Sequence, residues 1–147
     1  MFKHILIPTD GSKLSEKAIH AGVELARVHG AKVTGFFAAP APTPLVYGDF
    51  MPVGYMPPDQ HEALIEKASK RHLAVIERAG REVGVEVNSM LVTSEFPADA
   101  IVEAARQQHC DLIFMASHGR RGLSGILLGS ETQKVLTHAR IPVLVHR

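Results

Sequence analysis

Residues Leu112–Ser130 read Leu-Ile-Phe-Met-Ala-Ser-His-Gly-Arg-Arg-Gly-Leu-Ser-Gly-Ile-Leu-Leu-Gly-Ser. The apolar run Leu112–Ala116 is typical of a buried strand, and helical periodicity begins at Ser130. A glycine-rich loop with two arginines joins these segments. Glycine lets a backbone approach an anion closely, and the N–H groups at a helix N-terminus point toward it. The stretch therefore predicts a strand, a phosphate-holding loop and a helix, in that order.

The same alternation of apolar runs and helical periodicity extends along the whole chain. Strands are expected at Lys3–Pro8, Lys32–Phe37, Glu86–Val92, Leu112–Ala116 and Pro142–His146. Helices are expected at about Ser12–His29 and Asp59–Val83, from Pro97 onward, and from Ser130 to near His138. The middle three strands are apolar with little alternation, as expected of parallel strands covered on both faces. The pattern predicts an α/β fold with a doubly wound parallel sheet.

Capping residues and apolar spacing predict the ends and buried faces of the helices. Ser12 can cap the first helix and Gly30 can end it, while Gly84 ends the second. Pro97 suits the first turn of the third helix. The residues expected to face the core are Leu14, Ala18, Ala21, Gly22, Leu25 and Ala26 in the first helix, Leu64, Ala68, Val75, Ile76 and Ala79 in the second, and Ile101, Val102, Ala104 and Ala105 in the third.

Composition excludes several classes of protein. The chain has 147 residues, 46% of them hydrophobic, and a net charge of +1. This length suits a single domain, 1–147, and a nearly neutral charge argues against nucleic acid as the main partner. No apolar run reaches the roughly 18 residues of a membrane span. The one cysteine, Cys110, excludes an internal disulfide and favours a cytoplasmic location. We interpret it as a buried thiol rather than as a redox or metal group beside His109.

Ligands of doubly wound sheets bind outside the carboxyl ends of the strands, where the strand order reverses. This rule selects the loops after Pro8, after Phe37 and after Ala116. The first of them supplies a hydroxyl and a carboxylate, Thr9 and Asp10. The irregular, proline-rich segment 40–58 is longer than most loops of compact domains. We expect it to be a flap near the ligand or a contact for a protein partner, with a passive insertion as the alternative.

Two familiar phosphate motifs do not fit the glycine-rich loop. A P-loop ends in Gly-Lys-Ser/Thr, and there is no lysine between Lys70 and Lys134. The dinucleotide fingerprint Gly-x-Gly-x-x-Gly follows a first strand, but Pro8-Thr-Asp-Gly11 stands there. The histidines are scattered without a metal-ligand spacing that the rest of the chain supports.

The chain resembles the universal stress protein family. Nucleotide-binding members carry Gly, two residues, Gly, nine residues and then Gly-Ser/Thr. Here Gly119, Arg120–Leu128 and Gly129-Ser130 follow that pattern, with Ala116 in place of the first glycine. Further likeness lies in Ile5–Ser12, Phe96-Pro97, Met115–Gly119 and Ile141–Val145. The resemblance implies a Rossmann-like fold of the adenine nucleotide alpha hydrolase type, with five strands in the order 3-2-1-4-5.

The resemblance also implies ATP in the crevice and allows Mg²⁺ or Mn²⁺ beside it. Pro8, Thr9, Asp10, Ala38, Met115 and Ala116 would lie near the adenosine, and Gly119, Gly129, Ser130, Glu131 and Thr132 near the phosphates. His118 and Arg120 are further candidates for contact with the nucleotide. Asp10 would bond ribose hydroxyls or assist the metal, and Ser130 would cap its helix as well as donate to phosphate. From the residues alone, Asp10 as a helix cap and His118 and Arg120 as solvated loop groups stay open. Alanine at Ala116 is harmless if its φ is negative and costs about 1 kcal/mol if positive.

Three functions follow from different classes of protein. The first is an ATP-binding regulatory module of the stress response, with slow or partner-dependent hydrolysis at most. The second is a weak ATPase or nucleotidyl-transfer enzyme, and the third is a dimeric scaffold without nucleotide. The apolar strand Ile141–His146 is expected at a sheet edge. In the family, this strand pairs across a two-fold axis, so the resemblance implies a homodimer.

Overall fold

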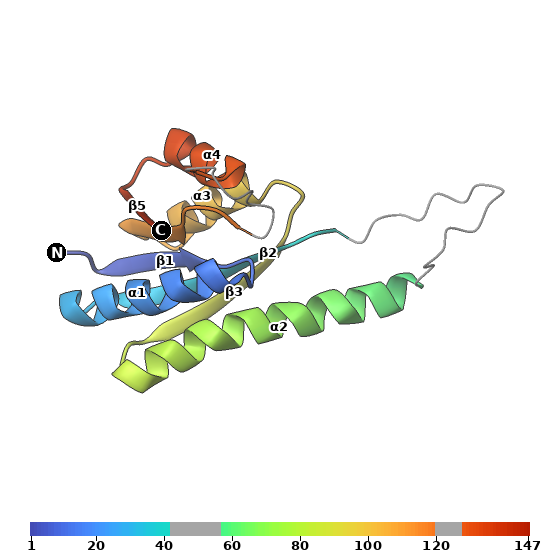
Figure 1. The fold of residues 1–147 in the computed structure, drawn as a ribbon, viewed down its shortest axis with the longest axis horizontal. Helices are drawn as coiled ribbons and strands as arrows, with labels where there is room; N and C mark the ends of the chain where they lie inside the picture. Colours follow the sequence, from blue (N-terminus) through green and yellow to red (C-terminus); the bar gives the residue numbers. More distant parts are fainter. Residues whose placement is uncertain (42–56, 120–127) are drawn as a thin grey trace.

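The computed structural model describes residues 1–41, 57–119 and 128–147. Within them, strands and helices alternate along the chain (Figure 1). The strands are β1 (His4–Pro8), β2 (Lys32–Ala39), β3 (Val87–Thr93), β4 (Leu112–Ala116) and β5 (Val143–His146). The helices are α1 (Lys13–His29), α2 (Pro58–Val83), α3 (Pro97–Gln107) and α4 (Ser130–His138). The predicted boundaries of these elements agree with the structure to within two residues.

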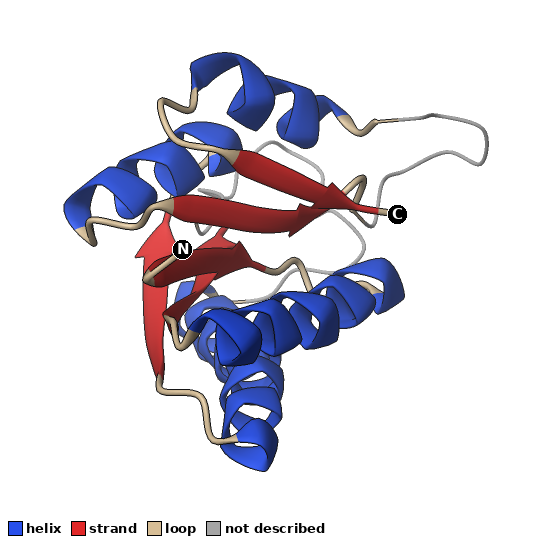
Figure 2. Cartoon of the chain, turned by 90° about the vertical axis from the view of Figure 1, so that its left-hand side faces the viewer, coloured by secondary structure: helices blue, strands red, loops and turns tan. Residues whose placement is uncertain are grey.

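The described strands form one five-stranded parallel sheet in the order β3-β2-β1-β4-β5, which confirms the predicted topology. Helices α1 and α2 cover one face of the sheet, and α3 and α4 cover the other (Figure 2). All five residues of β1 are buried between these layers. The chain leaves β1 toward β2 on one side and later returns as β4 on the other, so a crevice opens above the carboxyl end of β1.

The predicted helix signals act as expected at three helix ends. The Ser12 side chain accepts a hydrogen bond of 3.2 Å from the N–H of Ser15 and caps α1. Gly30 and Gly84 end α1 and α2 in the left-handed conformation, with φ of 64° and 74°. Residues with a Cβ rarely adopt such angles, so glycine is the natural residue at both positions.

The predicted buried face of α1 is partly wrong. The buried residues are Ser15, Ala18, Ile19, Gly22, Val23 and Ala26. Leu14, Ala21 and Leu25 are only partly buried. The buried stripe is displaced because α1 packs against α2 as well as against β1 and β4.

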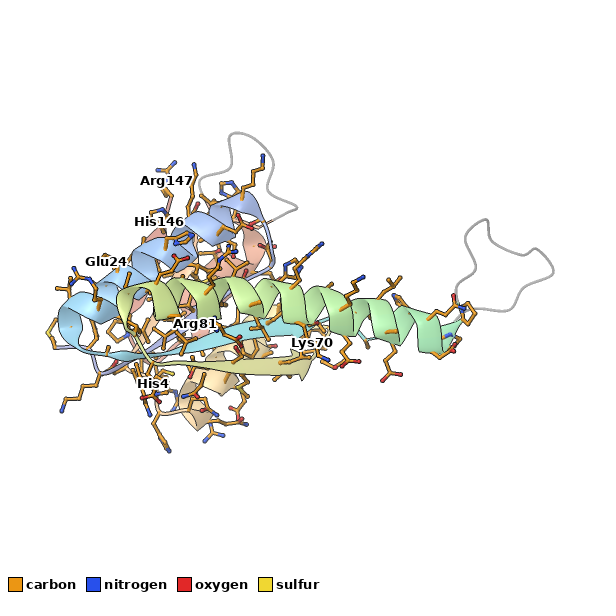
Figure 3. All side chains as sticks on the ribbon, turned by 90° about the horizontal axis from the view of Figure 1, so that it is seen from below. His4, Glu24, Lys70, Arg81, His146 and Arg147 are labelled. Atoms are coloured by element: carbon orange, nitrogen blue, oxygen red, sulfur yellow. The ribbon has the colours of Figure 1, made fainter. Side chains whose placement is uncertain are left out.

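Two further expectations about burial are corrected. Leu64 does not face the sheet but is 51% exposed, because the first half of α2 continues beyond the ends of the strands (Figure 3). The buried residues of α2 all lie between Ser69 and Gly80. The strand β3 is not covered on both faces, and Leu91 is 44% exposed. It is an edge strand of the sheet, and its Met90 and Val92 are only partly buried where they pack against the cluster that includes α3.

A polar cluster lies at the amino end of the sheet, away from the crevice. Asp111 accepts backbone hydrogen bonds from Lys3 and His4, at 2.8 and 3.0 Å. The His4 ring is buried and lies 2.8 Å from Thr34 Oγ1. Burial is the main reason why the pKa of His4 lies below its ordinary value, with Lys32 adding to the effect. Burial therefore favours a neutral imidazole, although Asp111 acts in the opposite direction.

Cys110 is buried, as predicted, just before β4. Burial raises the pKa of its thiol to about 12, so the thiol stays protonated at neutral pH. Most of the proline-rich segment 40–58 (residues 42–56) lies outside the described residues, as does Arg120. Among the described helices, none is both long and apolar enough to cross a membrane.

Candidate functional site

A cleft of about 460 Å³ opens at the carboxyl ends of the central strands. Its walls come from the turn after β1, the end of β2, the start of α3, and the segments on either side of residues 120–127. The predicted site residues that line it are Pro8, Thr9, Asp10, Ala38, Met115, Ala116, His118, Gly119, Gly129, Ser130, Glu131 and Thr132. Arg120, the remaining one, lies outside the described residues. The parallel topology therefore brings widely separated segments of the chain together around one cleft.

The cleft also contains residues that the sequence did not single out as site residues. They are Ser15, Phe36, Phe37, Pro97, Ile101, Leu128 and Gln133. Phe36 and Phe37 directly precede Ala38, and Pro97 is the first residue of α3. Their positions at the end of a strand and the start of a helix could have identified them as cleft residues from the sequence. Ile101 was predicted only as a core residue. It is buried and forms part of the apolar wall together with Phe36 and Met115.

The turn after β1 is held by its own side chains. Thr9 Oγ1 accepts hydrogen bonds from the N–H of Gly11 at 3.1 Å and from Ser15 Oγ at 2.8 Å. Asp10 Oδ1 accepts one from the N–H of Ser12 at 3.0 Å. Short bonds from a side chain to the backbone two residues later are typical of tight polar turns. The carboxylate of Asp10 is thereby fixed at the mouth of the cleft.

Ala38 offers its backbone to the cleft. The N–H of Thr9 donates to the carbonyl of Phe36 at 2.9 Å, so the backbone groups of Phe36 face β1. Backbone groups two residues apart in a strand point to the same side. The N–H and C=O of Ala38 therefore face the same side as those of Phe36, but beyond the last residue of β1. Such a pair can recognise a donor and an acceptor on the edge of a flat ring.

The end of β4 is tied to the start of α4. The N–H of Gly129 donates to the Ser117 carbonyl at 2.8 Å, and Thr132 Oγ1 donates to the Ala116 carbonyl at 3.1 Å. The N-cap is Gly129 rather than Ser130, which is the first residue of the helix, so the predicted capping role of Ser130 is wrong. Ser130, Glu131 and Thr132 of the first turn of α4 line the cleft. The first N–H groups of a helix have no partner within it, so this turn has donors that an anion could use.

Ala116 is compatible with the glycine pattern. Of the described residues other than glycine, only His109 has a positive φ, 52°. Ala116 ends β4 in ordinary strand geometry. Its methyl group therefore brings no backbone strain.

Close packing explains both described glycines of the pattern. A Cβ on Gly119 would overlap Asp10 Oδ2, and a Cβ on Gly129 would lie 3.1 Å from the Cα of His118. Neither glycine has a positive φ. Glycine at 119 therefore lets this segment approach the turn after β1. Glycine at 129 lets the start of α4 approach the segment that follows β4.

Glu131 and His118 already have partners in the protein. One oxygen of Glu131 accepts a hydrogen bond of 3.0 Å from the N–H of Ala98, at the start of α3, and the other pairs with Lys134 at 2.8 Å. This contact raises the pKa of Lys134. His118 Nδ1 lies 3.1 Å from Ser117 Oγ. Within the described ranges, no group of three or more His, Cys, Asp or Glu side chains could hold a metal ion.

Comparisons with known proteins agree with this fold. The family model described as the universal stress protein family matches residues 1–147. A universal stress protein of Thermus aquaticus is 34% identical over the whole of both chains. One from Methanocaldococcus jannaschii is 32% identical and covers 99% of this chain and 82% of its own.

Solved structures are similar over almost the whole chain. The protein MJ0577 of Methanocaldococcus jannaschii superposes with a TM-score of 0.80 at 25% identity, covering 99% of this chain and 95% of its own. Two more distant structures share the fold and contain a nucleotide. The Archaeoglobus fulgidus protein holds dAMP (TM-score 0.67, 21% identity, 100% and 98% coverage), and the Arabidopsis thaliana protein holds AMP (0.68, 16%, 97% and 90%).

Proposed function

This chain belongs to the universal stress protein family, and from that premise we propose that its cleft binds an adenine nucleotide, with ATP as the preferred form. One observation carries the proposal. A single cleft combines an apolar wall, the backbone pair of Ala38, the carboxylate of Asp10 and the N-terminus of α4. The apolar wall and the backbone pair suit a base, the carboxylate suits a sugar with hydroxyl groups, and the helix N-terminus suits a chain of phosphates.

The adenine ring would occupy the inner, apolar part of the cleft. Phe36, Ile101 and Met115 are each less than a tenth exposed and give this part its dry surface. The ring would lie between this surface and the end of β2, where the N–H and C=O of Ala38 reach its edge. Adenine presents an acceptor and an amino donor side by side, which matches such a backbone pair. Two structures of the same fold hold dAMP and AMP, which supports adenine as the base.

The ribose and the metal would be served by Asp10. An ionised carboxylate accepts hydrogen bonds only, which suits the two hydroxyl donors of a ribose. Mg²⁺ is commonly held by one or two carboxylates plus the phosphates of its substrate, so a single carboxylate fits a cation that arrives with ATP. When bound there, Mg²⁺ or Mn²⁺ would neutralise phosphate charge. Asp10 would otherwise repel that charge.

The phosphates would lie at the N-terminus of α4. The N–H groups of Ser130, Glu131 and Thr132 belong to its first turn, and the helix dipole favours negative charge there. The Ser130 side chain is exposed and can donate as well. The hydroxyl of Thr132 and the carboxylate of Glu131 are held by protein groups, so we assign these two residues a backbone role.

We propose a regulatory role in preference to efficient catalysis. Phosphoryl transfer needs an oriented nucleophile as well as charge and metal. In the described part of the cleft, the groups able to accept a proton are Asp10, Glu131 and His118. Each of them has a bond to a protein group. Bound ATP is therefore better suited to act as a signal, with hydrolysis that is slow or depends on a partner.

A homodimer through β5 is the second part of the proposal. The carbonyls of Pro142 and His146 face β4, so the backbone groups of Val143 and Val145 point away from the sheet. Leu144 is 38% exposed beside them. Val145→Pro would remove one outward N–H, and sedimentation should then show a monomer near 16.0 kDa in place of a dimer. A wild-type chain that is monomeric at micromolar concentration would contradict the dimer.

Nucleotide binding is tested by calorimetric titration of the whole protein with ATP, ADP and AMP in Mg²⁺. Mass analysis should also identify any nucleotide that co-purifies. We expect saturable binding that weakens from ATP to AMP, and Gly119→Val should abolish it. Equal affinity for ATP and AMP would contradict phosphate binding at α4. Unchanged binding by Gly119→Val would contradict the placement of the site.

A further inference from the structure

His72 of α2 lies directly beneath the turn that carries Asp10. The side chain is buried, with 7% exposure, although it does not line the cleft. Its ring lies so close to Gly11 that a Cβ on this glycine would overlap three ring atoms. The same ring packs against Phe37, with centroids 5.2 Å apart. One side chain of α2 thus touches two segments that form the cleft.

Gly11 meets two separate requirements at this contact. Its φ of 76° is one that residues with a Cβ rarely adopt. Its lack of a side chain also makes room for the imidazole. The N–H of Gly11 donates to Thr9 and the N–H of Ser12 to Asp10, so the turn is internally bonded and moves as a unit. A displacement of Gly11 would therefore carry the Asp10 carboxylate with it.

On its far side, this turn meets the glycine-rich loop. Asp10 Oδ2 lies against Gly119 without room for a methyl group between them. A continuous series of close contacts therefore runs from His72 through Gly11 and Asp10 to Gly119. Packed interiors transmit small displacements because they contain few voids. The position of α2 is in this way linked to the position of the carboxylate.

We infer that His72 is a positioning residue for the nucleotide cleft, so that nucleotide affinity depends on the position of α2 against the sheet. The inference rests on the proposed function and deepens it, because it names a route by which α2 can regulate the site. The flat ring sets the position of the turn after β1 and that of Phe37, which also lines the cleft. The N-terminal half of α2 continues beyond the strands (Figure 1). A force on that half would therefore act on the same ring.

The experiment compares two variants of similar size and polarity. His72→Phe keeps a flat ring against Gly11 and Phe37, whereas His72→Leu places branched methyl groups there. We expect the dissociation constant for ATP to stay within about threefold of wild type for the phenylalanine variant and to rise about tenfold for the leucine variant. Leu73→Val is the matched control, because Leu73 is as buried as His72 on the same helix and belongs to the core, whereas the ring against Gly11 is that of His72.

A double-mutant cycle tests the contact itself. Gly11→Ala should weaken ATP binding strongly in the wild-type background, because its methyl group meets the ring as well as the unfavourable φ. In the His72→Ala background, the added loss should be several-fold smaller, because only the strained φ is left. This non-additivity of binding is a property that a merely structural role of His72 would not produce.

Each outcome decides the matter. Loss of affinity in His72→Leu with retention in His72→Phe and Leu73→Val supports the inference, as does non-additivity in the cycle. Equal affinities in all variants, equal losses in His72→Leu and Leu73→Val, or an additive cycle would overturn it. Failure of the wild-type protein to bind any adenine nucleotide would instead refute the proposed function. If His72→Ala does not fold, the comparison of phenylalanine and leucine decides.

Discussion

Replacing Gly119 with alanine places a methyl group on the carboxylate of Asp10. The added Cβ would overlap Oδ2, while Oδ1 is held by the N–H of Ser12 at 3.0 Å. The carboxylate must therefore rotate or withdraw, and it can no longer meet a ribose or a metal at its original position. The backbone itself accepts alanine, because Gly119 does not have a positive φ. The substitution thus isolates the contact between the loop and the turn.

The substitution should weaken binding and lower the stability of the free protein by a smaller amount. Hydrogen bonds to charged groups are worth about 1.5–3 kcal/mol, so the dissociation constant should rise about 10- to 150-fold. Without ligand, loss of the bond to Ser12 is offset in part by the roughly 0.4–1 kcal/mol that alanine contributes by restricting the unfolded chain. The melting temperature should then fall by at most about 10 °C.

Calorimetry with ATP and thermal unfolding by circular dichroism measure the two effects. Gly84→Ala is the control. It makes the same chemical change at a φ of 74°, in open space at the end of α2. It should lower stability by about 1 kcal/mol and leave the affinity unchanged. Wild-type affinity in Gly119→Ala, or an equal loss of affinity in Gly84→Ala, would contradict a role of the contact between Gly119 and Asp10 in nucleotide binding.

Three further predictions follow. Ala116→Gly should change ATP affinity by less than about threefold, because the native φ is not strained; calorimetry would reveal a larger gain if the methyl group obstructs the nucleotide. The folded protein holds the pKa of His4 below 6.5, so the unfolded chain binds a proton first as the pH falls. The free energy of unfolding should therefore decrease as the pH falls below 6.5. Urea unfolding at several pH values should show a shallower acid loss in His4→Gln, and an identical slope would contradict this role. Cys110, with a pKa of about 12, should react with a thiol reagent at pH 8 only after unfolding, and rapid labelling of the native protein would contradict its burial.

The topology could be predicted because local signals and general rules agree along this chain. Ser12, Gly30 and Gly84 end helices by simple capping chemistry, and the apolar runs between helices are short enough for strands. A parallel sheet with one reversal of strand order then places the loops after β1, β2 and β4 together. The gathering of the cleft residues follows from topology rather than from any single motif.

The faces of the helices were less predictable because they depend on neighbours that the sequence does not show. Hydrophobicity favours Leu14 and Leu25, yet Ser15 is buried because its hydroxyl bonds Thr9. Leu64 has apolar spacing but lies on a part of α2 that extends beyond the sheet. The cap of α4 was misplaced by one residue, since Gly129 and Ser130 are both acceptable there. His72 carried no signal, because its contact with Gly11 joins segments far apart in the sequence.

Chemical-shift mapping of an isotope-labelled protein during a titration with Mg-ATP tests the central claim most directly. We expect saturable shifts of the backbone amides of Ala38, Gly119, Ser130 and Thr132, which line the cleft. The amide of Cys110, at the amino end of β4, should not move. Shifts centred on Cys110, or no saturable shift at millimolar ATP, would contradict the assignment of this cleft as an adenine nucleotide site.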